Sequence, residues 1–493
     1  MTSRLSRRRF ALAASALALP LAAACGGAAA PGATVPARPA EPRPGGTAPT
    51  ATAGQAPAAA TPSGQGAPTP EPTPVQPTPT VKPRDASMTS PDFSVHVFLW
   101  GGFDTTRRDL SLVKELGFNW VKQRFEWRYI EPHVKGKMEW TEPDRIVEAV
   151  TRAGLRMIAR VDNQPRWARA DPTWPIDGPP DRLADFGDFL EAMAKRYRGR
   201  IQAYQIWNEP NLAREWGNKP PNAKQYVDML KVAYGAIKSA DPGAVVISAG
   251  LSPTTASGAI ASPDVDFVKA MYLAGGKEYF DLLGVHAAGY KAPPELAPDE
   301  IARDPRYNHA EGSAGRIYGF RHAEDLRAVM VANGDGAKRA AILEFGWTSD
   351  PRPNSPYFWH AVTEEEKAAY LVRAFELARK SWQPWIGPMT VIYVADPAWT
   401  KEHEQYYWSI TDPDGSVRPA YRALQAMPKD AAPAPLTLSN PPATVTPSTG
   451  ATPAATAPAA PPASATKPGA QATAPPARAA TTPPASTRPV ATP

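Results

Sequence analysis

Short apolar runs alternate with longer amphipathic segments about eight times along the middle of the chain. The runs are rich in Val, Ile, Leu and aromatic residues and hold few charges, which is typical of parallel strands buried on both faces. Eight strand–helix units favour an α/β fold with a single closed (β/α)8 TIM barrel over an open doubly wound sheet. We expect the strands at 93–99, 118–123, 155–161, 201–207, 244–249, 281–286, 339–344 and 388–394.

The segments between these runs carry helical patterns. Leu183, Phe186, Leu190, Met193 and Tyr197 recur at three- and four-residue steps, so they share one face of a helix. No Gly-rich phosphate loop follows the first strand, so a dinucleotide-binding fold lacks its main signature.

Residues that are typical of helix starts and helix ends occur at the positions that a strand–helix repeat requires. Thr141 and Thr363 precede acidic first turns, as helix-capping residues do. Gly117, Gly154 and Gly199 stand just before predicted strands, where glycines end helices.

Composition separates the middle of the chain from its ends. The chain has 493 residues and 59 Pro, and all 14 Trp lie between Trp100 and Trp408. Pro, Ala and Thr dominate 26–90 and 431–493, which hold too few large apolar residues to offset the entropy of an ordered chain. We therefore expect a barrel domain at 91–430 between two disordered segments that act as spacers or tails.

The first 25 residues have the pattern of an export signal. Paired arginines before Phe10 resemble a twin-arginine signal, and the apolar run that follows is too short for a comfortable membrane span. Cys25 follows Leu-Ala-Ala-Ala, which resembles a lipobox and predicts a lipid-anchored protein at the cell surface. Ordinary cleavage after a small residue, with Cys25 free or removed, is the alternative.

Charge and side-chain chemistry narrow the partners. The formal net charge of +6 falls to +2 without the four arginines of the predicted signal. A charge this small does not indicate nucleic acid as a binding partner. We expect contact with a membrane only through the lipid anchor. One Cys excludes a disulfide scaffold within the chain, and the seven scattered His form no helical metal pair, so we expect no metal and no cofactor. The sequence leaves the oligomeric state open.

Two of the predicted strands end in a glutamate. Glu209 follows the fourth strand in a Trp-Asn-Glu-Pro motif, and Glu344 ends the seventh strand. The carboxyl ends of all strands meet at one rim of a barrel, so these two side chains are expected to face each other. One protonated and one ionised carboxyl group are what cleavage of a glycosidic bond requires.

This pair, with Asn208 before Glu209, resembles the site of glycoside hydrolase clan A, nearest to the cellulase- and xylosidase-like families 5 and 39. The resemblance covers nearly the whole middle domain. It implies that Glu344 is the nucleophile, Glu209 the general acid/base, Asn208 a ligand of the sugar 2-hydroxyl, and His286 part of the sugar site. It also implies retaining double-displacement hydrolysis of an oligo- or polysaccharide β-glycan outside the cell.

Two aromatic positions depart from the family pattern. After the sixth strand, Ala288 stands where the family has a tyrosine, and Tyr290 lies two residues further on. The eighth strand presents Tyr393 in place of a Trp platform, and we expect Trp399 in the next loop to cover the same face of the sugar.

The second strand departs from the family pattern at the position of its positively charged residue. With Trp127 fixing the register, the arginine of the family falls at Lys122, and Arg124 shares its face because strand side chains alternate. We expect either cation to hold Glu344 ionised, although a lysine gives up the bidentate geometry of arginine.

Further ring side chains near strand ends are candidates for sugar contact, because the CH faces of a pyranose pack well on aromatic rings. We expect about half of the six tryptophans to line the cleft and the rest to be core: Trp100, Trp127, Trp167, Trp216, Trp347 and Trp399. His96 on the first strand is a candidate both for sugar contact and for packing inside the barrel.

Two alternatives to hydrolysis stay open. The residues at Ala288 and Tyr393 fit a surface glycan-binding protein that kept the barrel and lost efficient chemistry. A transglycosidase would share the covalent intermediate and differ only in excluding water. The sequence leaves the glycan, its linkage and the choice between endo and exo cleavage open.

Overall fold

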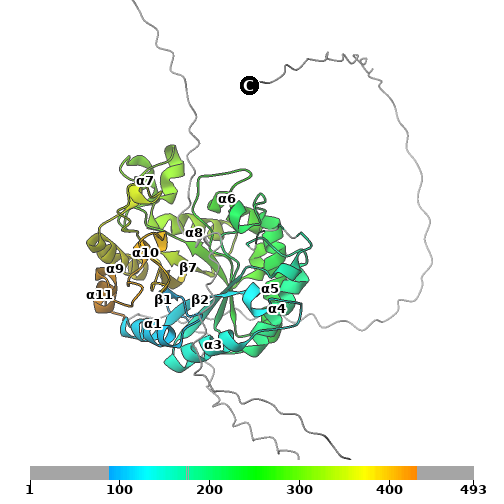
Figure 1. Ribbon diagram of the computed structural model, residues 1–493. Coiled ribbons are helices and arrows are strands. Elements are labelled where there is room, and N and C mark those ends of the chain that lie inside the picture. Colours follow the sequence, from blue (N-terminus) through cyan, green and yellow to red (C-terminus); the bar gives the residue numbers. More distant parts are fainter. Residues whose placement is uncertain (1–87, 172, 174, 176, 430–493) are drawn as a thin grey trace, which may run out of the picture. The chain divides into compact units, whose positions relative to one another are not determined.

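The computed structural model describes residues 88–429, apart from 172, 174 and 176, and forms a closed barrel of eight parallel strands (Figure 1). The strands pair in chain order, and the first closes on the last, with Val95 opposite Val391. They are β1 (Asp92–Val97), β2 (Trp120–Glu126), β3 (Arg156–Asp162), β4 (Ala203–Ile206), β5 (Val245–Ile247), β6 (Leu282–His286), β7 (Arg339–Phe345) and β8 (Ile386–Val391). The predicted fold class is confirmed, and each predicted strand overlaps an observed one.

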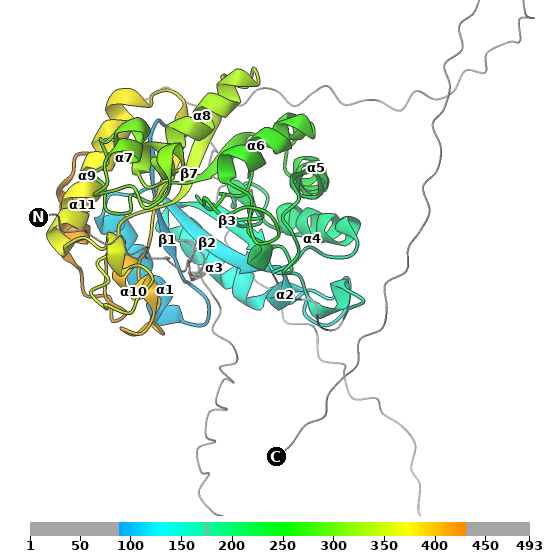
Figure 2. The same ribbon diagram turned by 90° about the horizontal axis from the view of Figure 1, so that it is seen from above.

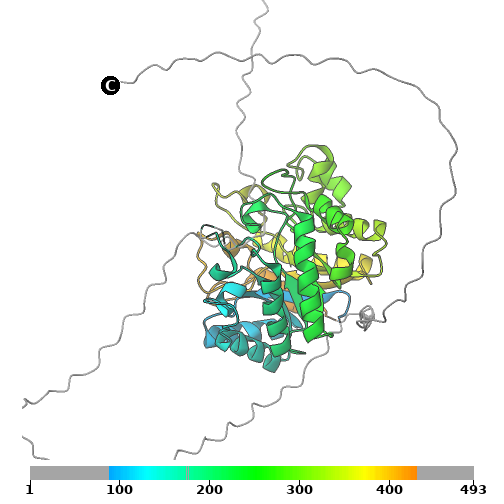
Figure 3. The same ribbon diagram turned by 90° about the vertical axis from the view of Figure 1, so that its right-hand side faces the viewer.

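Helices surround the strands, as Figures 1, 2 and 3 show from three sides. They are α1 (Phe103–Glu115), α2 (Trp127–Ile130), α3 (Thr141–Ala153), α4 (Leu183–Arg196), α5 (Ala223–Ala240), α6 (Asp264–Leu273), α7 (Pro298–Arg303), α8 (Ala323–Ala332), α9 (Glu364–Ser381), α10 (Glu404–Trp408) and α11 (Pro419–Ala426). The hydroxyl of Tyr421 on α11 donates to the carbonyl of Leu112 on α1 over 2.8 Å, so the last helix closes the shell against the first.

The predicted helix signals are confirmed with one exception. Thr363 caps α9 and forms a reciprocal capping box with Glu366. Gly154 ends α3 in the left-handed conformation with φ 76°, which a glycine adopts without strain. Thr141 is wrong as a cap: it is the first residue of α3, and Trp140 occupies the capping position.

The side chains inside the barrel change from apolar to charged along the barrel axis. Trp120, Ile158 and Ala203 belong to an apolar cluster that draws side chains from β2 to β7. Two residues further along the same strands, on the same face, stand Lys122 and Arg160, both buried. The apolar layer therefore supports a buried layer of charge below the carboxyl ends of the strands.

Some predictions fall outside the described residues. They concern the export signal at 1–25 with Cys25, nearly all of the segment 26–90, and the tail 431–493. Among the residues that are described, no helix is long and apolar enough to cross a membrane. Within the same residues no cluster of three or more His, Cys, Asp or Glu is suited to a metal ion.

Candidate active site

Glu209 and Glu344 both lie at the carboxyl rim of the barrel and are almost completely buried. Glu344 is the sixth residue of β7 and lies opposite His286, the last residue of β6. Glu209 follows β4 with a left-handed φ of 42°, and its backbone N–H donates to the carbonyl of Gly250 over 3.0 Å. A non-glycine residue holds such a conformation only where its surroundings impose it, so the turn after β4 fixes the direction of this carboxyl group.

The surroundings of Glu344 keep it ionised. Nζ of Lys122 lies 2.8 Å from Oε1 of Glu344 and also donates to the carbonyl of Leu343. Nη1 of Arg160 and Nδ1 of His96 lie 3.6 and 4.0 Å from the same oxygen. Burial by itself opposes ionisation, but the neighbouring positive charges, that of Lys122 above all, hold the pKa of Glu344 well below its usual range.

Glu209 has the opposite character. Its Oε1 lies 3.0 Å from Nδ1 of His286, and its Oε2 lies 3.3 Å from Nη2 of Arg214. Burial raises the pKa of Glu209 to about 8; Arg214 opposes this shift, and the charge of Glu344 adds to it. One carboxyl group is thus ionised and the other protonated at neutral pH, which is the division of roles that acid–base and nucleophilic chemistry need.

His286 is held neutral and closely packed. Burial lowers its pKa to about 3, so the ring hydrogen-bonds to Glu209 without a charge of its own. A Cβ atom at Gly250 would lie 2.1 Å from Cδ2 of His286, a distance that side chains do not tolerate. The loop after β5 therefore needs a glycine here to leave room for the imidazole.

Several polar atoms at this rim are buried without a hydrogen-bond partner among the described residues. They are Nδ2 of Asn208, Oε2 of Glu344, Nε2 of His286 and both ring nitrogens of His96. Buried polar atoms are nearly always paired in folded proteins. The hydroxyl groups of a sugar are the kind of partner that would satisfy such a set.

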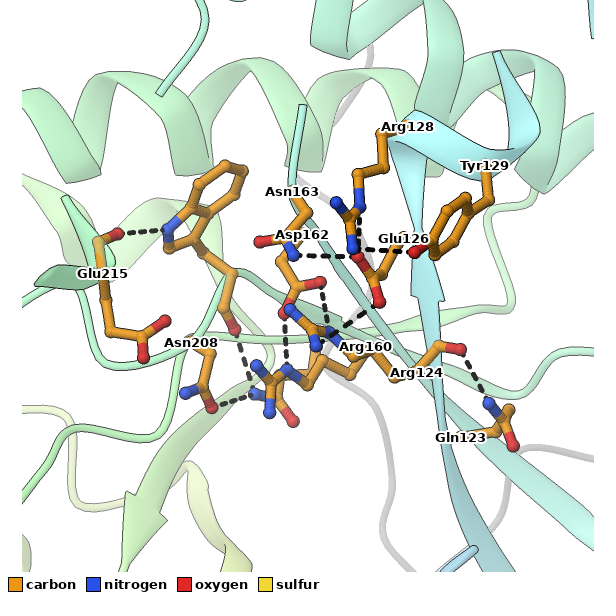
Figure 4. Close-up of polar contacts among 12 residues, drawn as sticks. Gln123, Arg124, Glu126, Arg128, Tyr129, Arg160, Asp162, Asn163, Asn208 and Glu215 are labelled. Atoms are coloured by element: carbon orange, nitrogen blue, oxygen red, sulfur yellow. Dashed lines mark hydrogen bonds and ion pairs between the residues drawn. The ribbon is translucent and has the colours of Figure 1, made fainter. Parts of the chain in front are cut away.

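The structure separates the two cations predicted on β2. Lys122 pairs with Glu344, whereas Arg124 is wrong as its counter-charge. Nε of Arg124 donates to Asp162 over 2.8 Å, and Nη1 lies 3.5 Å from Glu126 (Figure 4). Arg124 lies opposite Arg160 in the strand register, two residues beyond Lys122, and the carboxyl group of Asp162 binds its guanidinium group.

The aromatic predictions divide into core and rim. Trp127 and Trp347, two of the predicted sugar contacts, are fully buried, as is Trp216. Trp127 packs on Phe186 and Phe189 of α4, and the indole N–H of Trp347 donates to the carbonyl of Ala292 over 2.9 Å. Their size pointed to a platform, but each fills the layer between barrel and helices.

The other rings gather beside the barrel mouth. Tyr393 packs 5.3 Å from the ring of His96 and 5.2 Å from that of Trp399. Half-buried Phe98 contacts all three of these rings, so β1 and the loop after β8 form one aromatic wall near Glu344. Tyr290 belongs to the same apolar cluster as Tyr393, and its ring packs on those of Tyr318 and Trp359.

Arg160, Arg214 and Glu215 belong to the site, although the motif analysis did not find them. Arg160 bridges the layer, because its Nε donates to Asp162 over 2.6 Å (Figure 4), while its Nη1 lies 3.6 Å from Oε1 of Glu344. Arg160 and Asp162, two charged residues on the same face at the carboxyl end of β3, were the signal that could have identified it. Arg214 and Glu215 carry no such signal, because a turn brings them back to Glu209.

Comparison with known families gives one match. Residues 81–272 match the model of the cellulase family, glycosyl hydrolase family 5. Among curated proteins, none matches the chain.

Solved structures share the barrel. A family 5 subfamily 18 enzyme variant from Bifidobacterium longum, in complex with Manβ1-4GlcNAc, is 12% identical with a TM-score of 0.50 over 68% of this chain and 77% of its own. A family 39 glycoside hydrolase from Bacteroides cellulosilyticus is 20% identical with a TM-score of 0.49 over 69% of this chain. The present chain spans 63% of the length of that protein. A monomeric β-xylosidase from Caulobacter crescentus is 16% identical with a TM-score of 0.49, over 72% and 71% of the two chains.

Proposed function

We propose that this chain acts as a glycoside hydrolase of clan A and cleaves β-glycosidic bonds with retention of the anomeric configuration. The observation that carries the proposal is the unequal pair of carboxyl groups at the barrel rim. Glu344 is paired with Lys122 over 2.8 Å, while burial raises the pKa of Glu209 to about 8. A nucleophile must be ionised and a general acid protonated at the same pH, and this pair meets both conditions.

The proposed reaction has two steps. The Glu344 carboxylate attacks the anomeric carbon while Glu209 gives its proton to the departing glycosidic oxygen. Glu209, now ionised, then takes a proton from water as the water attacks the glycosyl ester, and Glu344 leaves as a carboxylate. Asn208 offers Nδ2, which is buried and without a partner among the described residues, to the sugar 2-hydroxyl.

We also propose that the substrate is an extracellular glycan and that the enzyme is anchored to the cell surface through Cys25. The support is the arginine-rich, apolar leader and the Leu-Ala-Ala-Ala-Cys sequence that ends it. Labelling cells that express the protein with a radioactive fatty acid tests this: the wild-type protein incorporates label, and C25A does not. Label in neither protein would contradict the anchor.

Replacing Glu344 by Ala and adding azide tests the catalytic assignment. We expect E344A to lose hydrolysis of 2,4-dinitrophenyl β-glycosides and, with azide, to form the α-glycosyl azide, because the small anion attacks in the nucleophile's place. E209A should instead give the β-glycosyl azide, because its covalent intermediate still forms and azide needs no base. Wild-type rates in E344A, or a product of inverted configuration from the wild-type enzyme by NMR, would overturn the assignment.

A further inference from the structure

Glu209 has to be protonated in one half of the proposed reaction and ionised in the other. The charged and titratable groups around it come from five elements: Arg160 on β3, Arg214 and Glu215 on the 3₁₀ helix η2 (Ala213–Glu215), His286 on β6, Glu344 on β7 and Glu404 on α10. Burial and the charge of Glu344 favour the proton on Glu209, and the two arginines oppose it. The charge of Glu209 in turn raises the pKa of Glu215 and of Glu404.

Arg214 differs from the other cations of the site. Lys122 and Arg160 are committed to partners in the buried layer, whereas the Arg214 side chain is 44% exposed and points at the acid/base. Its Nη2 lies 3.3 Å from Oε2 of Glu209, and its Nε lies 3.7 Å from Oε1 of Glu215.

The position of Arg214 is fixed by the motif that carries the acid/base. The indole N–H of Trp207 donates to the carbonyl of Glu215 over 2.9 Å, which ties the short helix η2 to the end of β4. The backbone N–H of Leu212 also donates to the carbonyl of Glu209 over 2.9 Å. The guanidinium group is therefore held beside the carboxyl group by the turn that follows it.

We propose that Arg214 is a positioning residue for the second half of the reaction, in which it favours the ionised Glu209 that activates water. The inference rests on the proposed function. In that step Glu209 takes a proton from water, the water oxygen bonds to the anomeric carbon, and the bond from that carbon to Glu344 breaks.

The effect of Arg214 depends on the state of Glu344. In the free enzyme, burial and the Glu344 charge together outweigh Arg214, and Glu209 keeps its proton. In the glycosyl-enzyme, Glu344 is an ester and its charge is gone, so the attraction of Arg214 for a carboxylate is no longer opposed by this neighbour. Arg214 therefore leaves Glu209 protonated in the first step, where an acid is needed. In the second step, where a base is needed, it favours the ionised form of Glu209.

The variant R214M tests this, with R214K as the conservative replacement. With 2,4-dinitrophenyl β-cellobioside, whose leaving group needs no proton, we expect steady-state turnover of R214M to fall about 10-fold while the burst of dinitrophenolate remains. Azide should restore turnover, because it attacks without a base. With phenyl β-cellobioside, whose leaving group does need the proton of Glu209, the basic limb of the kcat/KM profile should move up by about one pH unit, and R214K should stay close to wild type.

A matched control variant shows whether the loss of any half-exposed arginine side chain has the same effect on the kinetics. Arg373 is 42% exposed and pairs with Glu295 far from the catalytic glutamates in the sequence, and R373M should leave burst, turnover and pH profile unchanged. A wild-type pH profile and turnover in R214M would overturn the inference, while the wild-type burst and the E344A azide product would still support the proposed function.

A measurement without substrate tests the role of Arg214 even if the proposed function is wrong. We would titrate the ¹³C-labelled Glu209 carboxyl group by NMR in E344Q, which mimics the uncharged ester, and in E344Q/R214M, with E209Q for assignment. Glu209 should ionise about one pH unit higher in E344Q/R214M than in E344Q. Equal titration of the two proteins would overturn the role of Arg214 whether or not any glycoside is cleaved.

Discussion

Lys122 is fully buried and supplies the counter-charge nearest to Glu344, and its ammonium group is shared with the carbonyl of Leu343. A lysine is a point charge without the planar fork of an arginine, so it neutralises the carboxylate without fixing both of its oxygens. Oε2 of Glu344 is accordingly left buried without a partner among the described residues. At the scale of single residues, this lysine sets the charge of the nucleophile and leaves one of its oxygens unpaired.

We expect K122M to move the acid limb of the pH–rate profile upward by about one to three pH units. Lys122 lowers the pKa of Glu344, and activity is lost as the pH falls through that pKa, so removal of the ammonium group raises the limb. The measurement is kcat/KM against pH, with K122R as the control that keeps the charge. Coincident acid limbs in K122M and the wild-type enzyme would show that Arg160 is a sufficient counter-charge for Glu344.

At the scale of elements, the site depends on how the loop after β5 passes beneath the end of β6. Gly250 accepts the backbone N–H of Glu209 and lies against the ring of His286, so one residue positions both partners of the acid/base contact. Its φ lies outside the left-handed region, and the requirement for glycine is therefore one of space.

G250A should lower kcat at least about 10-fold with a small loss of stability, because the methyl group has to displace His286 from Glu209. Gly235 is the matched control: it lies in helix α5 with no atom within 4 Å of an added Cβ. G235A should keep full activity and raise the free energy of unfolding by about 0.5–1 kcal/mol, since alanine is the better helix former. Steady-state kinetics measure the activity of both variants, and urea unfolding measures their stability. Wild-type activity in G250A would mean that the loop after β5 can move to accommodate the methyl group.

At the scale of the whole molecule, stability and chemistry lie at opposite ends of the barrel. Asp92 begins β1 at the amino end, is fully buried, and accepts hydrogen bonds from Trp120 and Asn119, each over 3.0 Å. It lies opposite Pro388 where β1 closes on β8. The carboxyl end instead holds the two glutamates, together with atoms of Asn208 and His286 that are buried without a hydrogen-bond partner among the described residues.

D92A is expected to reduce the free energy of unfolding by about 3 kcal/mol, because several buried donors lose their acceptor at once. Since the change lies at the end of the barrel away from the chemistry, kcat should stay within about twofold of the wild-type value. Chemical unfolding and initial rates at a temperature where both proteins are folded provide the comparison. D104A, which removes a 91% exposed carboxyl group from α1, should change neither quantity. A fall in kcat that exceeds this range in D92A would indicate that the two ends are coupled.

The sequence by itself determined the barrel, the order of its strands and the two glutamates at their ends. Alternating apolar runs and helical faces are local patterns, and the short-range chemistry of Thr363 and Gly154 marks helix ends without reference to the rest of the chain. The Trp-Asn-Glu-Pro motif likewise places a carboxyl group directly after a strand. Thr141 shows the limit, because a capping pattern does not fix which residue begins the helix.

Only the tertiary structure decided which side chains meet. The sequence allowed Lys122 or Arg124 to face Glu344, and in the fold Lys122 pairs with Glu344 while Arg124 donates to Asp162. Trp127 and Trp347 read as sugar platforms, but burial against helices on the outside of the barrel is a property of packing. Arg214 reaches Glu209 through a turn, and Arg160 reaches Glu344 across the barrel. Contacts between distant segments follow from strand register and turn geometry, which local pattern leaves unspecified.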